Sequence, residues 1–322
     1  MILITGAAGF IGSAMIWKLN NRGVDSIIGA DRFHDGEKWN NLRKCLFYDW
    51  VDRDRLFDWL QDHGKLIKTV IHLGACTDTT ERDVDYFMQT NFEYSKKLWA
   101  FCVARQIPFL YASSAATYGA GEYGYIDDEK LIAKLRPLNP YGWSKQIFDR
   151  WVTQQTKKPP SWFGFKFFNV YGPNEFHKGH MASIIFHAFG QALNLSTIRL
   201  FKSHREDFEH GEQKRDFVYV KDVVDIMDFF LQNDIRSGIY NIGTGKARSF
   251  NDIAAATFDA LEKKTDITYF DMPENLKKQY QYFTEASIDK LKAVGYRGTI
   301  HELEEGITDY VKNHLSTEDP YL

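Results

Sequence analysis

The segment TGAAGFIGS, residues 5–13, decides the fold of this chain because three glycines stand between an apolar run and a helical pattern. Gly6 permits a tight turn, Gly9 lets the backbone approach a pyrophosphate, and Gly12 allows the helix to pack closely on the strand. Three glycines alone are weak evidence. Their position directly after the first expected strand predicts a loop that binds a dinucleotide.

Apolar runs and helical patterns alternate from this loop to about residue 170. The runs are ILIT, SIIGA, TVIHLGA, FLYASS and WFGFKFFN, which have the composition of buried strands in a parallel sheet. Between them, Ile11, Met15 and Leu19 have helical spacing, and a longer helical segment covers residues 85–105. Repeated βα units predict an α/β fold with a doubly wound parallel sheet of the Rossmann type.

The order of elements becomes irregular in the second half of the chain. The expected elements are a helix over 181–193 and short strands over 199–201, 217–220 and 239–242. We find no internal repeat and no low-complexity linker, so the two halves should pack together. The sequence predicts a dinucleotide-binding Rossmann domain over 1–170 and a smaller, mainly substrate-binding α/β domain over 171–322, with some segments returning to the first.

Composition excludes several classes of partner. The chain of 322 residues carries 40 basic and 43 acidic side chains, a balance too even to hold nucleic acid or an anionic membrane by charge.

Neither a signal-peptide pattern nor an apolar stretch of about 18 residues is present, so we expect a soluble, cytoplasmic protein. Cys45, Cys76 and Cys102 are widely spaced and predict reduced thiols, with no metal site. The expected partner is a small molecule.

Charged residues after the second expected strand bear on the choice of cofactor. Asp31 ends that strand 19 residues after Gly12 and would accept hydrogen bonds from the adenosine ribose, which favours NAD. Arg32 follows it, and Lys38 and Arg53 lie in segments that reach the same corner. Cations beside this ribose favour the 2′-phosphate of NADP. We predict NADP, with NAD as the alternative.

A possible proton-transfer group lies in NPYGWSKQ, where Tyr141 and Lys145 stand four residues apart. If a helix begins here, both side chains lie on one face, and the lysine can lower the phenol pKa from its usual value of about 10. Ser114 ends another expected strand and can hydrogen-bond the same substrate oxygen. If the spacing of Tyr141 and Lys145 stood alone, an exposed tyrosine at the start of an ordinary helix would be the alternative interpretation.

The glycine loop, the strand-end serine and the YxxxK spacing together resemble the extended short-chain dehydrogenase/reductase family over nearly the whole chain. Dehydratases of that family place an Asp-Glu pair directly after the catalytic Ser or Thr. Ala115 and Ala116 occupy those positions here. The resemblance therefore implies an epimerase or a simple reductase.

A second proton carrier is suggested by HKGH, residues 177–180. Inversion through a ketone removes a hydride from one face and returns it to the other. If an exocyclic carbonyl rotates about one bond, its oxygen occupies two places, and a second acid/base group becomes useful at the other place. Lys178 is the candidate, although a lysine in such a segment more often is solvated or contacts phosphate. The role requires a pocket that lowers its pKa toward neutrality.

Several segments resemble, more closely, the ADP-heptose 6-epimerase family of nucleotide-sugar epimerases. They include LGACTDTTE, FFNVYGPNEFHKGHMAS, KRDFVYVKDV and YNIGTG. The resemblance implies transient oxidation at the exocyclic C6″ centre of ADP-heptose by bound NADP, rotation of the ketone and reduction on the opposite face, in lipopolysaccharide core synthesis. Tyr141 and Lys178 would each serve one epimer. It also implies a homo-oligomer, a pentamer.

The same resemblance implies further site residues, most of which would otherwise be ordinary core or surface positions. Arg215 matches an arginine that binds the substrate diphosphate, where a structural ion pair is the alternative. The other substrate residues would be Ser114, Asn169, His180, His187, Phe201 and Tyr280. Beside the glycines, Asp31 and its neighbouring cations, the cofactor would be bordered by Phe10, Ile11, Leu73, Ala75, Cys76, Asn91, Tyr141, Lys145, Val170 and Lys178.

Three departures from the family pattern concern the substrate more than the reaction. His180 stands where a serine is common, Leu73 replaces a more usual acidic residue, and the segment SHREDFEHGEQ, residues 203–213, is longer than usual. Because this segment leads into Arg215, its greater length is expected to change either the binding of the substrate nucleotide or a contact between subunits. Two other functions stay open: a UDP-hexose 4-epimerase, which would not require Lys178, and a non-catalytic NADP-binding sensor.

Overall fold

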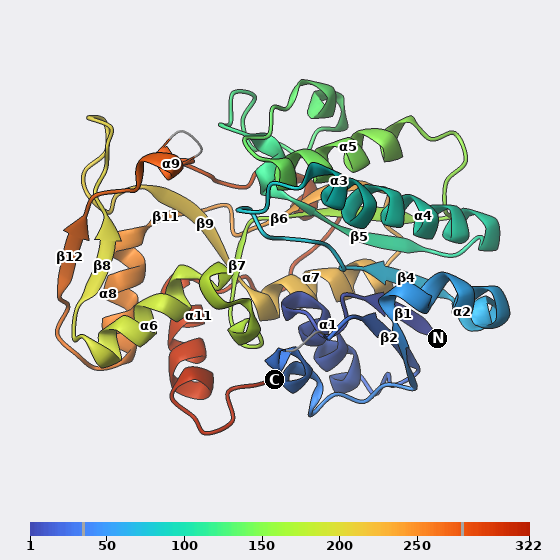
Figure 1. The fold of residues 1–322 in the computed structure, drawn as a ribbon, viewed down its shortest axis with the longest axis horizontal. Helices are drawn as coiled ribbons and strands as arrows, with labels where there is room; N and C mark the ends of the chain where they lie inside the picture. Colours follow the sequence, from blue (N-terminus) through green and yellow to red (C-terminus); the bar gives the residue numbers. More distant parts are fainter. Residues whose placement is uncertain (34–35, 278–279) are drawn as a thin grey trace.

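The computed structural model describes residues 1–33, 36–277 and 280–322 (Figure 1). Its central element, within those residues, is a seven-stranded sheet with the order β10-β6-β5-β4-β1-β2-β3, and every adjacent pair is parallel. The strands are β1 (Ile2–Thr5), β2 (Ile27–Asp31), β3 (Asp49–Asp52), β4 (Thr69–His72), β5 (Phe109–Ser114), β6 (Trp162–Phe167) and β10 (Gly238–Ile242). The prediction of a doubly wound parallel sheet is confirmed.

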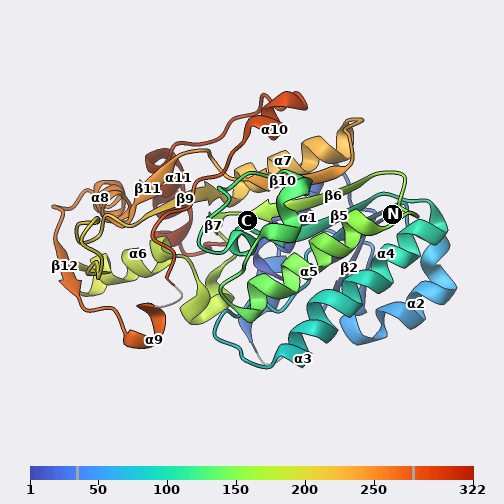
Figure 2. The same ribbon diagram turned by 90° about the horizontal axis from the view of Figure 1, so that it is seen from above.

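Helices cover both faces of this sheet (Figures 1 and 2). On one face lie α2 (Leu56–His63), α4 (Tyr94–Arg105) and α5 (Pro140–Gln154), whose buried side chains share one apolar cluster with the strands. On the other face lie α1 (Phe10–Asn21) and α7 (Val220–Gln232), which pack against each other. Because both faces are covered, the strands are apolar throughout, which is why they appear as continuous apolar runs in the sequence.

The second half of the chain contributes to this sheet before it ends. Helix α7 packs on α1, and β10 adds to the edge at β6, with Ile239 opposite Gly164. The same apolar cluster continues from α1 and α7 into the rest of the second half. The two halves therefore share one core.

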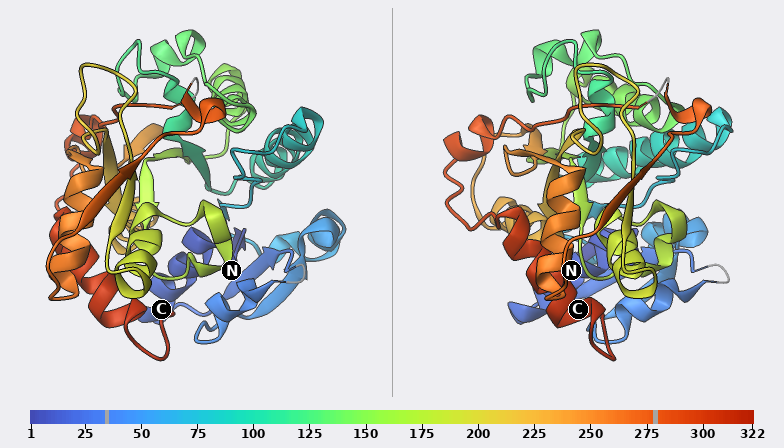
Figure 3. Two further views of the ribbon diagram at one scale, coloured as in Figure 1. Left: turned by 60° about the vertical axis from the view of Figure 1, so that its left-hand side comes forward. Right: turned by 90° about the vertical axis from the view of Figure 1, so that its left-hand side faces the viewer.

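The remainder of the second half forms a smaller α/β unit beside the sheet (Figure 3). Its strands are β7 (Asn169–Tyr171), β9 (Lys214–Tyr219) and β11 (Ala247–Ser249) in one sheet, and β8 (Ile198–Phe201) with β12 (Ile267–Phe270) in another. Its longer helices are α6 (Ile184–Asn194), α8 (Phe250–Ala260) and α11 (Leu303–Tyr310). The expected helix over 181–193 is thus α6, and the expected strands at 199–201, 217–220 and 239–242 correspond to β8, β9 and β10.

Short helices complete the fold: α3 (Val84–Phe87), α9 (Glu274–Lys277) and α10 (Asp289–Ala293). Across the described parts of the chain, none of the helices combines the length and the apolar character that crossing a membrane would require.

Candidate active site

The glycine loop is packed so closely that side chains would not fit. A Cβ atom on Gly12 would lie 2.0 Å from the Gly6 carbonyl oxygen, and one on Gly6 would lie 2.6 Å from the amide nitrogen of Gly74. Gly6 also has a φ of +68°, which favours glycine. Gly9 precedes helix α1 as its N-cap and supplies no side-chain cap, and the first turn of α1 has no acidic residue. Its first N–H groups can therefore bind an anion, which fits the pyrophosphate of a dinucleotide.

A cavity of about 450 Å³ opens at this loop, along the carboxyl ends of the parallel strands. It is bordered by the glycine loop, the segments after β2 and β4, the end of β5, the start of α5 and the 176–181 segment. The sequence-predicted residues that line it are Gly6, Gly9, Phe10, Ile11, Gly12, Asp31, Arg32, Lys38, Arg53, Leu73, Ala75, Cys76, Ser114, Tyr141, Lys145, Val170 and Lys178. The structure thus brings the expected catalytic residues, and the expected cofactor residues other than Asn91, to one cavity.

At one end of the cavity, Asp31 links the loop to a cation. One carboxylate oxygen accepts from the Ala8 amide at 3.0 Å, and the other accepts from Lys38 Nζ at 2.6 Å. Arg32 forms an ion pair with Asp54 at the same corner, and Arg53 lies over the ring of Tyr94. This corner holds both an acceptor suited to ribose hydroxyls and cations suited to a phosphate.

Asn91 lies behind the cavity wall and does not line the cavity. It is buried within a π-helical stretch, Met88–Glu93. Its side-chain amide accepts from the Cys76 N–H at 2.8 Å and donates to the Cys76 carbonyl at 2.9 Å and to Ser144 Oγ at 2.9 Å. Asn91 therefore fixes the backbone after β4, which itself borders the cavity.

Tyr141 and Lys145 lie on one face of α5, as their spacing predicted. The helix begins cleanly because the Asn139 side chain caps the Gly142 amide at 2.8 Å and proline occupies the first position. The Ser114 hydroxyl hydrogen-bonds the Tyr141 phenol and also accepts from the Ala116 amide at 3.1 Å. Lys145 Nζ donates to the Ala112 carbonyl at 2.9 Å.

Burial controls the protonation of this group. It raises the pKa of Tyr141, and the hydrogen bond from Ser114 opposes that rise. Burial also lowers the pKa of Lys145 to about 8, and the negative charge of Asp149 opposes that change. Ser114 is therefore the group that favours the Tyr141 phenolate here.

Lys178 approaches the same cavity from a short 3₁₀ segment, Phe176–Met181. Its Nζ lies 5.2 Å from the ring centre of Phe10, in the glycine loop. Burial lowers the pKa of Lys178, while the charge of Glu175 opposes this. The direction is the one that an acid/base role requires.

Glu175 also explains why the Lys178 segment has a fixed position. Its buried carboxylate accepts from the Ser183 amide at 2.5 Å, from Ser183 Oγ at 2.7 Å and from the Gly172 amide at 3.2 Å. These bonds join the end of β7 to the start of α6 across the segment. The segment that contains Lys178 is therefore held at both ends by the hydrogen bonds of Glu175.

The other predicted substrate residues lie outside this cavity. Arg215 is 7% exposed, and its guanidinium carbon lies 5.1 Å from the ring centre of Tyr280. Phe201 meets the edge of Tyr280 at 6.4 Å. These three residues form what we call the outer group. Asn169 is exposed at the start of β7, beside the cavity-lining Val170.

The two histidines predicted on the substrate side are also separate from the cavity lining in the described chain. His180 is exposed, two residues after Lys178. His187 is half-buried in α6. The unusually long segment 203–213 packs beside the outer group, because the His204 amide donates to the Tyr282 hydroxyl at 2.9 Å and Tyr282 contacts Tyr280.

Sequence reasoning missed several residues that line the cavity. His177 and Met181 flank Lys178, and Thr77 follows Cys76, so their neighbours in sequence were a usable signal. His177 contacts the Asn41 side chain at 3.1 Å, and burial lowers its pKa to about 4. The remaining lining residues include Thr5, Gly74, Tyr86, Thr90, Tyr94, Ala112, Ser113, Phe167 and Phe168. Most of these carry no local signal, because only the fold brings them to the cavity.

Known proteins resemble this chain over its whole length. A protein from Fusobacterium nucleatum subsp. nucleatum named ADP-L-glycero-D-manno-heptose-6-epimerase is 53% identical over 332 aligned positions, which cover 100% of both chains. A protein of the same name from Nitratidesulfovibrio vulgaris is 46% identical, again over 100% of both. The crystal structure of ADP-L-glycero-D-manno-heptose-6-epimerase from Helicobacter pylori matches with a TM-score of 0.78 and 28% identity, and the match covers 97% of this chain and 95% of that one.

A family model matches the part of the chain that builds the sheet and the cavity. The match spans residues 2–243, from β1 to just beyond β10, and so includes the glycine loop, Tyr141, Lys145 and Lys178. It covers more than half of the chain and agrees with the relatives above. The chain belongs to the NAD dependent epimerase/dehydratase family.

Proposed function

We propose that this protein converts ADP-D-glycero-D-manno-heptose to ADP-L-glycero-D-manno-heptose by inverting C6″, a step that supplies lipopolysaccharide core precursors. One observation carries the proposal: Tyr141 and Lys178, from two separate elements, border the same cavity as the dinucleotide loop. The names of the full-length relatives specify the substrate. Two proton carriers in one cavity suit an exocyclic carbonyl that rotates between two positions.

The chain's own groups handle the proton in both directions. A nicotinamide dinucleotide bound along the glycine loop supplies the reversible hydride transfer. For one epimer, the Tyr141 oxygen accepts the proton of the C6″ hydroxyl, and the Ser114 hydroxyl donates to the phenolate that favours this transfer. For the other epimer, Lys178 Nζ accepts the proton of the C6″ hydroxyl. The hydrogen bonds of Glu175 hold the Lys178 segment in place, so that Lys178 Nζ stays close to the ketone oxygen while the ketone rotates.

The outer group is proposed to hold the substrate diphosphate. Arg215 is buried. Among the described residues, no carboxylate forms an ion pair with Arg215, and its guanidinium donates one hydrogen bond, to the Lys214 carbonyl at 2.9 Å. A buried guanidinium that lacks an acidic partner is suited to an anionic ligand. Phe201 and Tyr280 would flank that ligand, and Asn169, His180 and His187 would contact the sugar between the outer group and the cavity.

We propose NADP as the cofactor because Arg32, Lys38 and Arg53 all border the adenosine end of the cavity. The family establishes only a nicotinamide dinucleotide. Titration of the purified protein, freed of bound dinucleotide, with NADP and with NAD would decide between them. Tighter binding of NADP is expected, and equal or tighter binding of NAD would contradict this choice.

Three organisational proposals follow from the sequence, the last of them from the family resemblance. The domain division is proposed at residue 170, with α7 and β10 returning to the first sheet. The protein is proposed to be cytoplasmic and to form a homo-oligomer, a pentamer. Light scattering of the purified protein tests the last point, because a mass of one 37.5 kDa chain would contradict it.

The function is tested by proton NMR of ADP-D-glycero-D-manno-heptose incubated with purified protein and no added cofactor. A mixture of both C6″ epimers is expected, with recycled bound dinucleotide as the oxidant and reductant. If the sugar stays unchanged even with added NADP or NAD, while UDP-glucose is converted at C4, the protein is a UDP-hexose 4-epimerase. If dinucleotide binds and neither sugar changes, the non-catalytic sensor is the better interpretation.

A further inference from the structure

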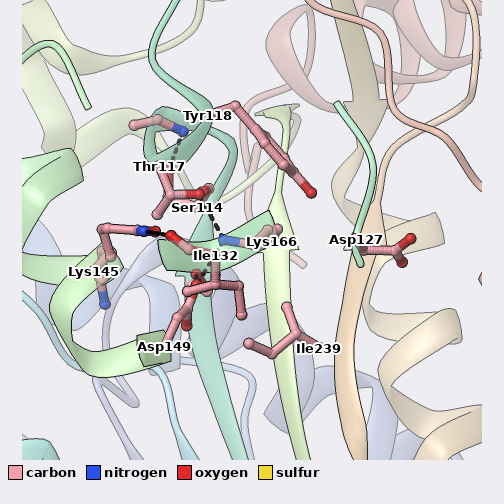
Figure 4. A network of polar contacts seen from close by, with 12 residues as sticks. Ser114, Thr117, Tyr118, Asp127, Ile132, Lys145, Asp149, Lys166 and Ile239 are labelled. Carbon is pink, nitrogen blue, oxygen red and sulfur yellow. Dashed lines mark hydrogen bonds and ion pairs between the residues drawn. The ribbon is translucent and has the colours of Figure 1, made fainter. Parts of the chain in front are cut away.

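A fully buried ion pair lies directly behind Ser114 and Lys145. Lys166 on β6 is 1% exposed and Asp149 on α5 is 0% exposed, and Lys166 Nζ lies 2.6 Å from an Asp149 carboxylate oxygen (Figure 4). The Asp149 carboxylate also accepts from Ser113 Oγ at 2.7 Å and from the Tyr111 hydroxyl at 3.0 Å. Burying two charges costs desolvation energy, and apolar replacements of such pairs are often as stable. Stability alone therefore does not explain the pair.

A chain of hydrogen bonds joins Lys166 to the backbone of Ser114. Lys166 Nζ donates to Thr117 Oγ at 2.6 Å, and the Thr117 hydroxyl lies 2.7 Å from the Ser114 carbonyl oxygen. A lysine ammonium can only donate, so the single Thr117 proton is directed to Ser114. The turn that follows β5 is thereby tied to the ion pair, and Ser114 is held where it meets Tyr141.

The other half of the pair acts on Lys145. Asp149 follows Lys145 by four residues in α5, so both face the same side of the helix. Its charge opposes the effect of burial, which lowers the pKa of Lys145 to about 8.

Cys76 is the second group whose charge would raise the pKa of Lys145, and Asp149 has the larger effect. Burial raises the pKa of Cys76 and of Tyr141, and burial lowers the pKa of His72 to about 3. Asp149 is therefore the main negative charge that acts on Lys145.

We propose that the Lys166–Asp149 pair is a positioning element of the active site, which fixes Ser114 through Thr117 and places a negative charge behind Lys145. This inference rests on the proposed redox function, in which Ser114 and Lys145 serve Tyr141 and the dinucleotide. Lys166 and Asp149 act through these residues and touch neither the substrate nor the cofactor.

The Thr117 link is tested by comparing Thr117→Val with Thr117→Ser. Valine removes the hydroxyl and keeps the volume, whereas serine keeps the hydroxyl and removes a methyl group. We expect T117V to lower kcat about tenfold with little change in KM, because Ser114 loses its fixed position, and T117S to stay close to the wild type. A T117V enzyme within twofold of T117S would overturn the link.

The charge of Asp149 is tested by the pH dependence of dinucleotide binding, which needs no sugar substrate. If the Lys145 ammonium holds the dinucleotide, affinity falls as pH rises through the Lys145 pKa, near 8 in the wild type. In Asp149→Asn the opposing charge is gone, so the fall should occur about one pH unit lower. An unchanged profile in the folded variant would overturn the proposal.

A folding defect does not remove this test. If D149N fails to fold because Lys166 is left unpaired, the double variant Asp149→Leu/Lys166→Met removes both charges and is expected to fold. It should shift the binding profile in the same direction but by less, because the Lys166 charge that is also removed acts opposite to that of Asp149. An unshifted profile would overturn the proposal. The two experiments distinguish this proposal from the proposed function. Epimerisation of ADP-heptose, followed by NMR, tests the function, whereas the pH dependence of dinucleotide binding tests the effect of Asp149 on Lys145 even in a protein that does not epimerise this sugar.

Discussion

The cofactor cavity and the outer group around Arg215 are built in different ways. The cavity lies at the carboxyl ends of adjacent parallel strands, with the glycine loop packed against the segment after β4. The outer group is formed by side chains from β8, β9 and the segment at Tyr280, which meet only through ring and cation contacts. The order of the strands in the main sheet positions the first site, whereas the second depends on contacts between side chains of separate segments. Under the proposed function, the cavity would set the reaction and the outer group would select the substrate.

The largest effect that this difference predicts is at Tyr141. Tyr141→Phe removes the phenol and should lower kcat about a thousandfold while the dinucleotide still binds. Tyr86→Phe, in the same cavity lining, is the matched control and should retain activity. Turnover by stopped assay and dinucleotide titration together check this. An active Y141F enzyme would show that chemistry does not reside in the sheet-edge cavity.

Lys178→Met should lower turnover about a hundredfold, because one of the two positions of the rotating ketone loses its proton carrier. Burial lowers the pKa of Lys178, so its neutral form is accessible closer to neutrality than that of a solvated lysine. Lys65→Met, at an exposed lysine outside the cavity lining, serves as the control. Turnover measured from each epimer separately is the readout. Unaffected turnover of K178M would favour a ring-rotating epimerase that needs Tyr141 alone.

Arg215→Met separates the two regions most sharply. It should raise KM for ADP-heptose about thirtyfold and leave dinucleotide affinity unchanged, because the lost contacts are charge-assisted bonds to the substrate. Arg199→Met, which removes an exposed arginine that lies over Phe270, is the control. Weaker dinucleotide binding in R215M would mean that the outer group is not a separate substrate site.

The smallest expected effect is at the adenosine corner. Arg32→Ala should weaken NADP binding about threefold and NAD binding less, because this partly exposed guanidinium already pairs with Asp54. Arg55→Ala, outside the cavity, should change neither affinity. If R32A weakened both dinucleotides equally, Arg32 would act on the shape of the corner and not on the 2′-phosphate.

The same difference explains what could be predicted from the sequence. The sheet and the cavity follow local rules: apolar runs identify β1, β2, β4, β5 and β6, and the glycine spacing and YxxxK identify the backbone around them. The strand β3, with the sequence DWVD, and the short strands β11 and β12 lack a long apolar run, so their existence depends on tertiary pairing.

Residues whose role depends on distant contacts were harder to predict. Asn91 was assigned to the cofactor, yet it supports the Cys76 backbone from behind. The rise of the Tyr141 pKa through burial, and the hydrogen bond from Ser114 that opposes this rise, were not predicted from the sequence. Lys166 and Asp149 form an ion pair across β6 and α5 although 17 positions separate them in the chain. No spacing rule signals these contacts.

The most direct test of the transient redox reaction is epimerisation of ADP-D-glycero-D-manno-heptose in deuterium oxide, followed by NMR at C6″. The hydride leaves to the bound dinucleotide and returns from it, so both epimers should form and both should carry ordinary hydrogen at C6″. Deuterium at C6″ in the product would contradict the account, because it would show that the centre is inverted by loss and uptake of a proton exchanged with solvent.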